Sequence, residues 1–185
     1  MHYSYAQTPR RQVNVMELKA VFEFVSPKVR EAAVKTAEQL TQLNIRHALA
    51  GGLAVGAHGY VRATIGVHFL VGEEALEHHG TIVTFKAGVP IEVEGIRIDY
   101  LSPVSLGSQL EAALDNPPTS EGMPVVPLEV LIYMKLVANR RQDQLDVVEL
   151  VKAGADVKQM ESYLEQYAAD LRPMFAELVN EALAG

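Results

Sequence analysis

Residues 48–72 read ALAGGLAVGAHGYVRATIGVHFLVG, and this stretch decides the fold that the sequence predicts. It includes the end of a short apolar strand, 47–50, which stops at Gly51 and Gly52. Glycine lacks a Cβ atom, so the backbone here can turn tightly or come close to a phosphate group. Helix-forming residues follow over 53–58 and end at another glycine, which is typical of a helix C-terminus. The stretch therefore predicts a strand, a glycine turn and a short helix in direct succession.

A second strand is predicted over residues 66–71, at the end of the same stretch. Side chains alternate between the two faces of a strand, so Gly66, His68 and Leu70 share one face while Val67, Phe69 and Val71 point the other way. Arg62 and Thr64 lie just before this strand. This arrangement indicates a unit that builds a site where the helix passes into the strand.

The motifs of this unit resemble those of the nucleotidyltransferase-like superfamily, in particular its small bacterial members and the AbiEii-type toxins. The family pattern is a strand, Gly-Gly or Gly-Ser, a short helix ending in a His-Gly-Tyr-like turn, Arg-x-Thr, and Asp-x-Asp on the next strand. The matching motifs here are Gly51-Gly52, His58-Gly59-Tyr60 and Arg62-Ala63-Thr64. Gly66 and His68 stand where the pattern has its two aspartates, so the Asp-x-Asp motif is degenerate. In the family, those aspartates and a third carboxylate on a neighbouring strand hold Mg²⁺ on a nucleoside triphosphate.

The resemblance places Asp99 at the position of the third carboxylate, on a strand predicted over 96–101. Two interpretations of His68 stay open. In the first, the imidazole fills the cleft of a former catalytic site and hydrogen-bonds to Asp99 or Thr64. In the second, His68 and Asp99 form a remodelled site for a softer cation such as Zn²⁺ or Mn²⁺, because imidazole suits these ions better than Mg²⁺. We favour the first, and so expect no metal, because two ligands make a poor cage. His58, beside a helix-ending glycine, is expected to cap the helix or to lie at the surface.

A second family signal lies in residues 135–146, which read KLVANRRQDQLD. Relatives show a lysine, an arginine and two aspartates, and Lys135, Arg140, Asp143 and Asp146 reproduce that spacing. Residues three apart share a helix face, and carboxylates near a helix N-terminus interact favourably with its dipole. The resemblance implies nucleotide binding by these four residues together with Gly51, Gly52, Arg62 and Thr64. The simpler interpretation, a charged helix start with its acids paired to Arg140, is preferred on the local sequence alone.

The composition limits the classes of function. The chain has 185 residues, 49% hydrophobic and 21% charged, which is ordinary for a globular protein. It has no cysteine, so disulfides and thiolate metal sites are excluded. Its 16 basic and 23 acidic residues give a net charge of −7, which disfavours general nucleic-acid binding. No apolar run reaches the roughly 20 residues of a membrane helix and no signal-like leader opens the chain, so we expect a cytoplasmic protein without membrane contact.

The predicted fold class is α+β, a mixed sheet backed by helices with a C-terminal helical cluster, as the resemblance implies. Its strands are expected at 47–50, 66–71, 81–86, 91–93 and 96–101. Helices are expected at 27–43, 53–58 and 104–114, then from 127 onward, with a short polar helix or loop over 73–79. The domain prediction is a flexible leader at 1–12, an α/β core at 13–115 and a helical part at 124–185 that packs on the core.

Two classes of function follow, beside that of a plain structural subunit whose cleft is filled by side chains. The first is a nucleotidyltransferase-fold protein that has lost transfer and binds a nucleotide, a phosphate, a protein partner or a second copy. The second is an active nucleotidyltransferase with an altered metal site, which would use Mg²⁺ or Mn²⁺ with a nucleoside triphosphate and modify a protein or nucleic-acid hydroxyl. The metal ligands separate them, because two cations about 3.5–4 Å apart need several bridging oxygens, and Gly66 supplies none.

Overall fold

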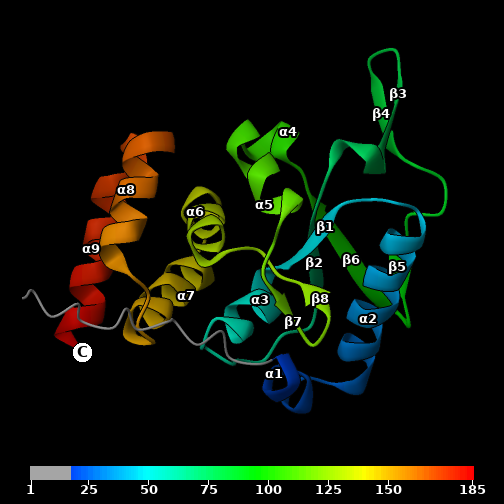
Figure 1. Ribbon diagram of the computed structural model, residues 1–185. Helices are drawn as coiled ribbons and strands as arrows, with labels where there is room; N and C mark the ends of the chain where they lie inside the picture. Colours follow the sequence, from blue (N-terminus) through cyan, green and yellow to red (C-terminus); the bar gives the residue numbers. More distant parts are fainter. Residues whose placement is uncertain (1–17) are drawn as a thin grey trace, which may run out of the picture.

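A computed structural model describes residues 18–185 and has the predicted α+β architecture (Figure 1). The predicted leader 1–12, and residues 13–17 of the predicted core, lie outside the described residues. The main sheet has the order β1-β2-β6-β5. Its strands are β1 (His47–Ala50), β2 (Val67–Val71), β6 (Ile96–Leu101) and β5 (Glu92–Val93). The β1–β2 and β5–β6 pairs are antiparallel and the β2–β6 pair is parallel, so the sheet is mixed as predicted.

The centre of the sheet is the β2–β6 pair, on which the predicted site depends. The two strands are neighbours, which confirms that prediction, and their register places His68 opposite Asp99. Every side chain of β1 is buried, and in β2 only His68 is partly exposed. The sequence alternation therefore opens one face of β2 at His68 while Val67 and Phe69 enter the core.

The N-terminal helices follow from local signals in the sequence. Helix α2 (Pro27–Gln42) begins after Ser26, whose side chain accepts a hydrogen bond from the Val29 amide, and it packs across the strands of the sheet. Helix α1 (Leu18–Phe24) packs on α3 (Gly51–Ala57). Helix α3 starts at Gly51, two residues before the predicted start, and its C-terminal turn includes Gly59 at a φ of 116°.

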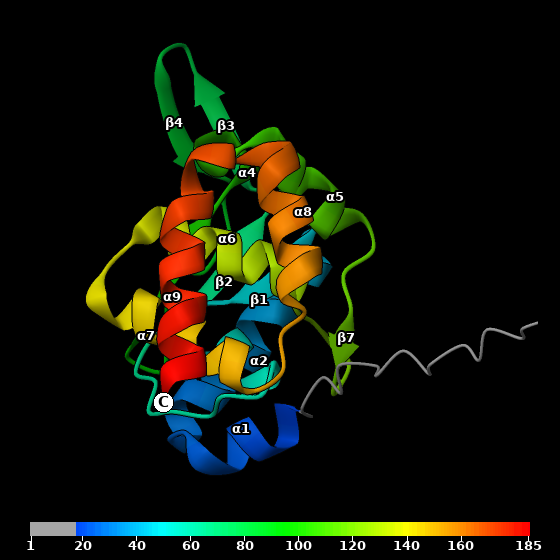
Figure 2. The same cartoon turned by 90° about the vertical axis from the view of Figure 1, so that its left-hand side faces the viewer.

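The C-terminal part is a cluster of four helices, as predicted. They are α6 (Leu128–Ala138), α7 (Arg141–Lys152), α8 (Val157–Tyr167) and α9 (Arg172–Ala184). Asn139 separates α6 from α7 in a left-handed conformation with a φ of 48°. Figure 2 shows α8 and α9 side by side on the outside of this cluster. Buried side chains of the sheet and of these helices join one hydrophobic core, while the proposed boundary near residue 124 stays a prediction.

The strand predicted at 81–86 was assigned to the wrong sheet. It is β4 (Ile82–Phe85), and it pairs only with β3 (Leu76–His79) in a separate two-stranded hairpin. The segment 73–79, expected as a polar helix or loop, is one 3₁₀ turn (η1, Glu73–Ala75) followed by β3. The hairpin stands away from the body of the molecule in Figures 1 and 2, and every side chain of β4 is exposed. Period-two alternation predicts a strand but does not identify its partner.

The helix predicted at 104–114 is interrupted. Gly107, at a φ of 127°, separates α4 (Pro103–Leu106) from a 3₁₀ turn (η2, Ser108–Leu110) and α5 (Glu111–Asp115). The connection to the helical cluster contains a small hairpin of β7 (Thr119–Ser120) and β8 (Met123–Pro124), and a further 3₁₀ turn (η3, Ala169–Leu171) precedes α9. Across residues 18–185, no helix is both long enough and apolar enough to cross a bilayer.

Candidate functional site

A cleft of about 950 Å³ lies between the open face of β2 and β6 and the helices α6 and α7. It is lined by nine of the ten residues singled out in the sequence: Gly51, Gly52, Arg62, Thr64, His68, Asp99, Lys135, Arg140 and Asp143. The tenth, Asp146, is fully buried and pairs with Arg62 and Lys135. The structure thus brings together residues spread over nearly 100 positions of the chain, and their role in binding stays a prediction.

The strand wall of the cleft contains Gly66, His68 and Asp99. His68 Nε2 lies 3.9 Å from Asp99 Oδ2, too far for the hydrogen bond that the sequence suggested. Asp99 Oδ1 instead lies 3.0 Å from the Nε of the exposed Arg97. Burial lowers the pKa of His68 below its ordinary value; Asp99 opposes this shift, whereas Lys135 and Arg140 add to it. The imidazole is therefore neutral near pH 7.

The two glycines at the start of α3 lie directly against the side chains of the cleft. A Cβ atom on Gly51 would come within 2.8 Å of the His68 ring, and Gly51 has a φ of 64°. A Cβ atom on Gly52 would come within 2.5 Å of Thr64 Oγ1 and 3.2 Å of Arg62 Nη1. Side chains at either position would push His68, Thr64 and Arg62 out of place. The structure therefore gives Gly51 and Gly52 a packing role, and phosphate approach at this turn stays a prediction.

A buried network of ion pairs forms the helical wall. Lys135 Nζ lies 2.8 Å from Asp143 Oδ1 and 2.8 Å from Asp146 Oδ2. Arg62 donates to both oxygens of Asp146, from Nε at 2.6 Å and from Nη2 at 2.8 Å. Arg140 Nε donates to Asp143 Oδ2 at 2.7 Å. The network joins the loop before β2 to α6 and α7, so it connects the sheet to the helical cluster.

The electrostatics of this network follow from its burial. Burial alone would raise the pKa of Asp143 and Asp146. Hydrogen bonds outweigh this effect and hold both pKa values below the ordinary value. Asp143 accepts them from Arg140 and Lys135, and Asp146 accepts them from Arg62 and Lys135. Both carboxylates are therefore ionised at neutral pH. Three cations face two anions, so the network carries one net positive charge beside the cleft.

The charged helix start preferred from the local sequence describes only part of this network. Asp143 accepts a hydrogen bond from the Arg140 backbone N–H at 3.3 Å, as expected of a helix-start acid. However, Asp143 and Asp146 are almost fully buried and both are bound by Lys135, eight and eleven residues earlier. Sequence reasoning missed Gln142, whose Nε2 donates to Asp146 Oδ1 at 3.0 Å. Its spacing of four from Asp146 was the available signal.

The remaining wall of the cleft is apolar. It consists of Leu101 from β6, Leu106 at the end of α4, and Leu131, Met134, Val137 and Ala138 from α6. Its larger part is therefore the side of α6 that faces the cleft. The cleft therefore combines an apolar surface with a cationic one, as many small-molecule sites do.

The metal-binding capacity of the strand wall is small. Gly66 has no side chain, and within residues 18–185 no group of three or more histidine or carboxylate residues is placed to hold a metal ion. Asp143 and Asp146 are bound by cations, which compete with any metal. Two cations in a transfer site need several bridging oxygens, so these residues do not fit a Mg²⁺ pair.

Comparisons with protein-family models and with curated proteins found no match. Among solved structures, the chain is similar to an antigenic nucleotidyltransferase-like protein from Paracoccidioides brasiliensis, at 14% sequence identity and a TM-score of 0.44. The similarity covers 82% of this chain and 93% of that chain.

Proposed function

We propose that the chain is a nucleotidyltransferase-fold protein that binds a nucleotide, or another organic phosphate, without metal-dependent nucleotidyl transfer. The observation that carries this proposal is the chemistry of the strand wall, where Gly66, His68 and Asp99 occupy the positions at which transfer needs carboxylates. Asp99 is paired with Arg97 and offers one carboxylate. A pair of cations needs several oxygens to neutralise the charge that develops on the transferred group.

The size and lining of the cleft support a nucleotide as the ligand. Its volume of about 950 Å³ is at the upper end of the range for small-molecule sites. The apolar wall on α6 suits a base, and the cationic network suits a phosphate. Arg140 is the accessible cation, with 72% of its side chain exposed, and its fork of N–H donors matches a phosphate.

The expected affinity is modest because most of the positive charge is already compensated. Arg62 and Lys135 are held by Asp143 and Asp146, so one net positive charge remains to attract the ligand. Without a divalent ion to offset a triphosphate, we expect a Kd of roughly 0.1–1 mM, about 4–5.5 kcal/mol. Salt should weaken the binding through screening.

The test is a titration of ATP, GTP, CTP and inorganic phosphate, followed by backbone amide NMR signals. We expect saturable shifts around Gly52, Thr64 and His68. Arg140→Gln should weaken binding about tenfold, because it removes the exposed charged donor. Arg141→Gln is the matched control, because Arg141 is the next residue, is exposed and does not line the cleft. If no amide of the cleft shifts, or if both variants weaken binding equally, the proposal is wrong.

One observation favours the second candidate function, an active transferase with an altered metal site. His68 and Asp99 are register partners, and their 3.9 Å separation is compatible with one cation bound by ligands at about 2.0–2.2 Å each. Incubation with radiolabelled triphosphates and Mg²⁺, Mn²⁺ or Zn²⁺ separates the candidates. Label transferred to a protein or nucleic-acid acceptor, and lost in His68→Ala, would support transfer. Absence of label with all three ions supports binding without transfer.

A further inference from the structure

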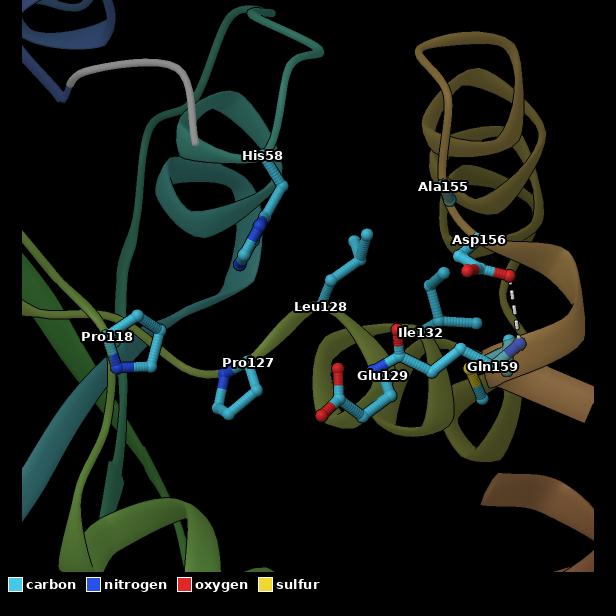
Figure 3. A pocket seen from close by; sticks show the side chains of 10 residues that line it. His58, Pro118, Pro127, Leu128, Glu129, Ile132, Ala155, Asp156 and Gln159 are labelled. Atoms are coloured by element: carbon cyan, nitrogen blue, oxygen red, sulfur yellow. Dashed lines mark hydrogen bonds between the residues drawn. The ribbon is translucent and has the colours of Figure 1, made fainter. Parts of the chain in front are cut away.

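A second cavity, of about 230 Å³, lies where the end of α3 meets the starts of α6 and α8 (Figure 3). It shares no lining residue with the cleft described above. Most of its wall is apolar and comes from Pro118, Pro127, Leu128, Ile132 and Met160. The volume is below the roughly 300 Å³ at which sites for drug-sized ligands begin, so an occupant must be small.

His58 lines this cavity, and of its two expected roles, helix cap or surface residue, the structure confirms the cap. Only 6% of the residue is exposed, although it does end α3 as the C-cap. Its Nε2 lies 2.7 Å from the carbonyl oxygen of Val126. A carbonyl can only accept, so Nε2 carries the proton. Burial lowers the pKa of His58, so the ring is neutral near pH 7 and its Nδ1 is an acceptor. Among the side-chain hydrogen bonds of residues 18–185, His58 takes part through Nε2, so Nδ1 is left to accept from a ligand.

Two carboxylates complete the polar part of the cavity. Glu129 lies in the first turn of α6, and Asp156 precedes α8, where its Oδ1 accepts from the Gln159 backbone N–H at 3.0 Å (Figure 3). Neither carboxylate has a cationic side chain within 4 Å among the described residues. The cavity therefore presents three acceptors and an uncompensated negative charge beside an apolar wall.

We propose that this cavity binds an alkylammonium group, carried either by a small aliphatic amine or by a lysine side chain. The ammonium donates hydrogen bonds to Glu129 and to Nδ1 of His58, and Asp156 adds negative potential. The alkyl chain lies against Leu128, Ile132 and the prolines. An anion would be repelled, and a neutral alcohol would leave both carboxylates without a counter-charge.

The first experiment compares three small molecules of the same chain length: n-butylammonium, n-butanol and butyrate. Binding is followed by NMR at the Hε1 proton of His58 and the methyl group of Met160. We expect saturable shifts with n-butylammonium and a Kd on the order of 1 mM, since so small a ligand offers few contacts. Butanol should bind at least about tenfold more weakly, because charge-assisted hydrogen bonds are lost, and butyrate should not bind. Equal binding of butanol, or no saturable shift with n-butylammonium, would overturn the proposal.

Charge-removing variants test the assigned acceptors. Glu129→Gln should weaken n-butylammonium binding about tenfold. Asp156→Asn should weaken it less, and the α8 cap is retained because Asn caps a helix as well as Asp does. Glu161→Gln is the matched control, since Glu161 is an exposed acid of α8 outside the cavity. Equal weakening by the control would show that only the net charge of the protein matters, and the proposal would fail.

A lysine-containing peptide identifies the source of the ammonium group. The probe is acetyl-Gly-Lys-Gly-amide, titrated beside n-butylammonium. Tighter binding of the peptide assigns the cavity to a lysine side chain of a partner, whereas tighter binding of n-butylammonium assigns it to a free amine. If neither ligand shifts the His58 or Met160 signals, the cavity is not an ammonium site, and the cleft proposal is unaffected because the two sites share no residue.

Discussion

Asp146→Asn is the sharpest perturbation of the network that joins the sheet to the helical cluster. The Asp146 side chain has no exposed surface. Its carboxylate accepts from Arg62 Nε at 2.6 Å, Arg62 Nη2 at 2.8 Å and Gln142 Nε2 at 3.0 Å, and lies 2.8 Å from Lys135 Nζ. Asparagine keeps the size of the side chain but replaces one oxygen by an NH₂ group. That group would point its hydrogens at cationic donors.

The magnitude follows from these contacts. At least one charge-assisted hydrogen bond is lost, about 1.5–3 kcal/mol, and the buried network changes from one to two uncompensated positive charges. Removing one partner of a buried ion pair costs about 3–5 kcal/mol. We therefore expect the free energy of unfolding to fall by about 3–5 kcal/mol. A domain of this kind has a total of about 5–15 kcal/mol, so the loss is a large fraction of the stability.

Urea unfolding monitored by circular dichroism measures this change. The control is Glu149→Gln, which removes an exposed i,i+3 pair with Lys152 at 3.1 Å and should change stability by no more than about 0.5 kcal/mol. Arg62→Met combined with Asp146→Asn restores the net charge of the network, so we expect the double variant to lose less than the sum of the single losses. An Asp146→Asn cost below about 1 kcal/mol would refute the view that the network is a buried and compensated unit.

Two further predictions concern Gly51, at the start of α3, and the buried histidines His47 and His58. Gly51→Ala should destabilise the protein by about 2–4 kcal/mol, because alanine is strained in a left-handed conformation and its Cβ atom would collide with the His68 ring. The control is Gly80→Ala, at a φ of 68° in open space, which should cost only the backbone strain of about 1–2 kcal/mol. Equal losses in thermal or urea unfolding would contradict the packing role of Gly51. Burial lowers the pKa of His47 and His58 below 6.5, so the unfolded chain binds protons that the native chain does not. The free energy of unfolding should therefore fall as the pH drops from 7.5 through 6.5, by up to about 1.4 kcal/mol per pH unit for each histidine. Urea unfolding at pH 7.5, 6.5 and 5.5 measures this change, and a constant free energy of unfolding would exclude the linkage.

Much of the fold could be predicted because its signals are local. Alternation predicted β2, and the strands expected at 91–93 and 96–101, on either side of Gly95, are β5 and β6. The helices expected at 27–43 and from 127 onward are α2 and the C-terminal cluster. The partner of β4 could not be predicted, since alternation specifies a strand and not its neighbour. Its apolar residues Ile82, Val83 and Phe85 suggested a place in the main sheet, yet they are 63%, 50% and 41% exposed.

The candidate site was predicted as a set of residues but not as a physical environment. Spacing placed Asp143 and Asp146 on one helix face, and only the tertiary structure shows that Lys135 and Arg62 bury that face. The low exposure of His58 was missed for the same reason. Its position beside a helix-ending glycine is local, whereas its low exposure comes with tertiary packing, in which its Nε2 binds the carbonyl oxygen of Val126, 68 residues away.

Calorimetric titration of ATP, with and without Mg²⁺, tests most directly the claim that the cleft binds nucleotide without metal-dependent transfer. The native protein should bind with a Kd of roughly 0.1–1 mM, and Mg²⁺ should not raise the affinity, because the strand wall has too few oxygen ligands to hold the ion on a bound triphosphate. The variant with Gly66→Asp and His68→Asp should gain Mg²⁺-dependent binding. Space for the first aspartate exists, since a Cβ atom on Gly66 meets only the His68 ring, at 3.5 Å and beyond. A native protein whose affinity for ATP rises tenfold or more with Mg²⁺ would contradict the account.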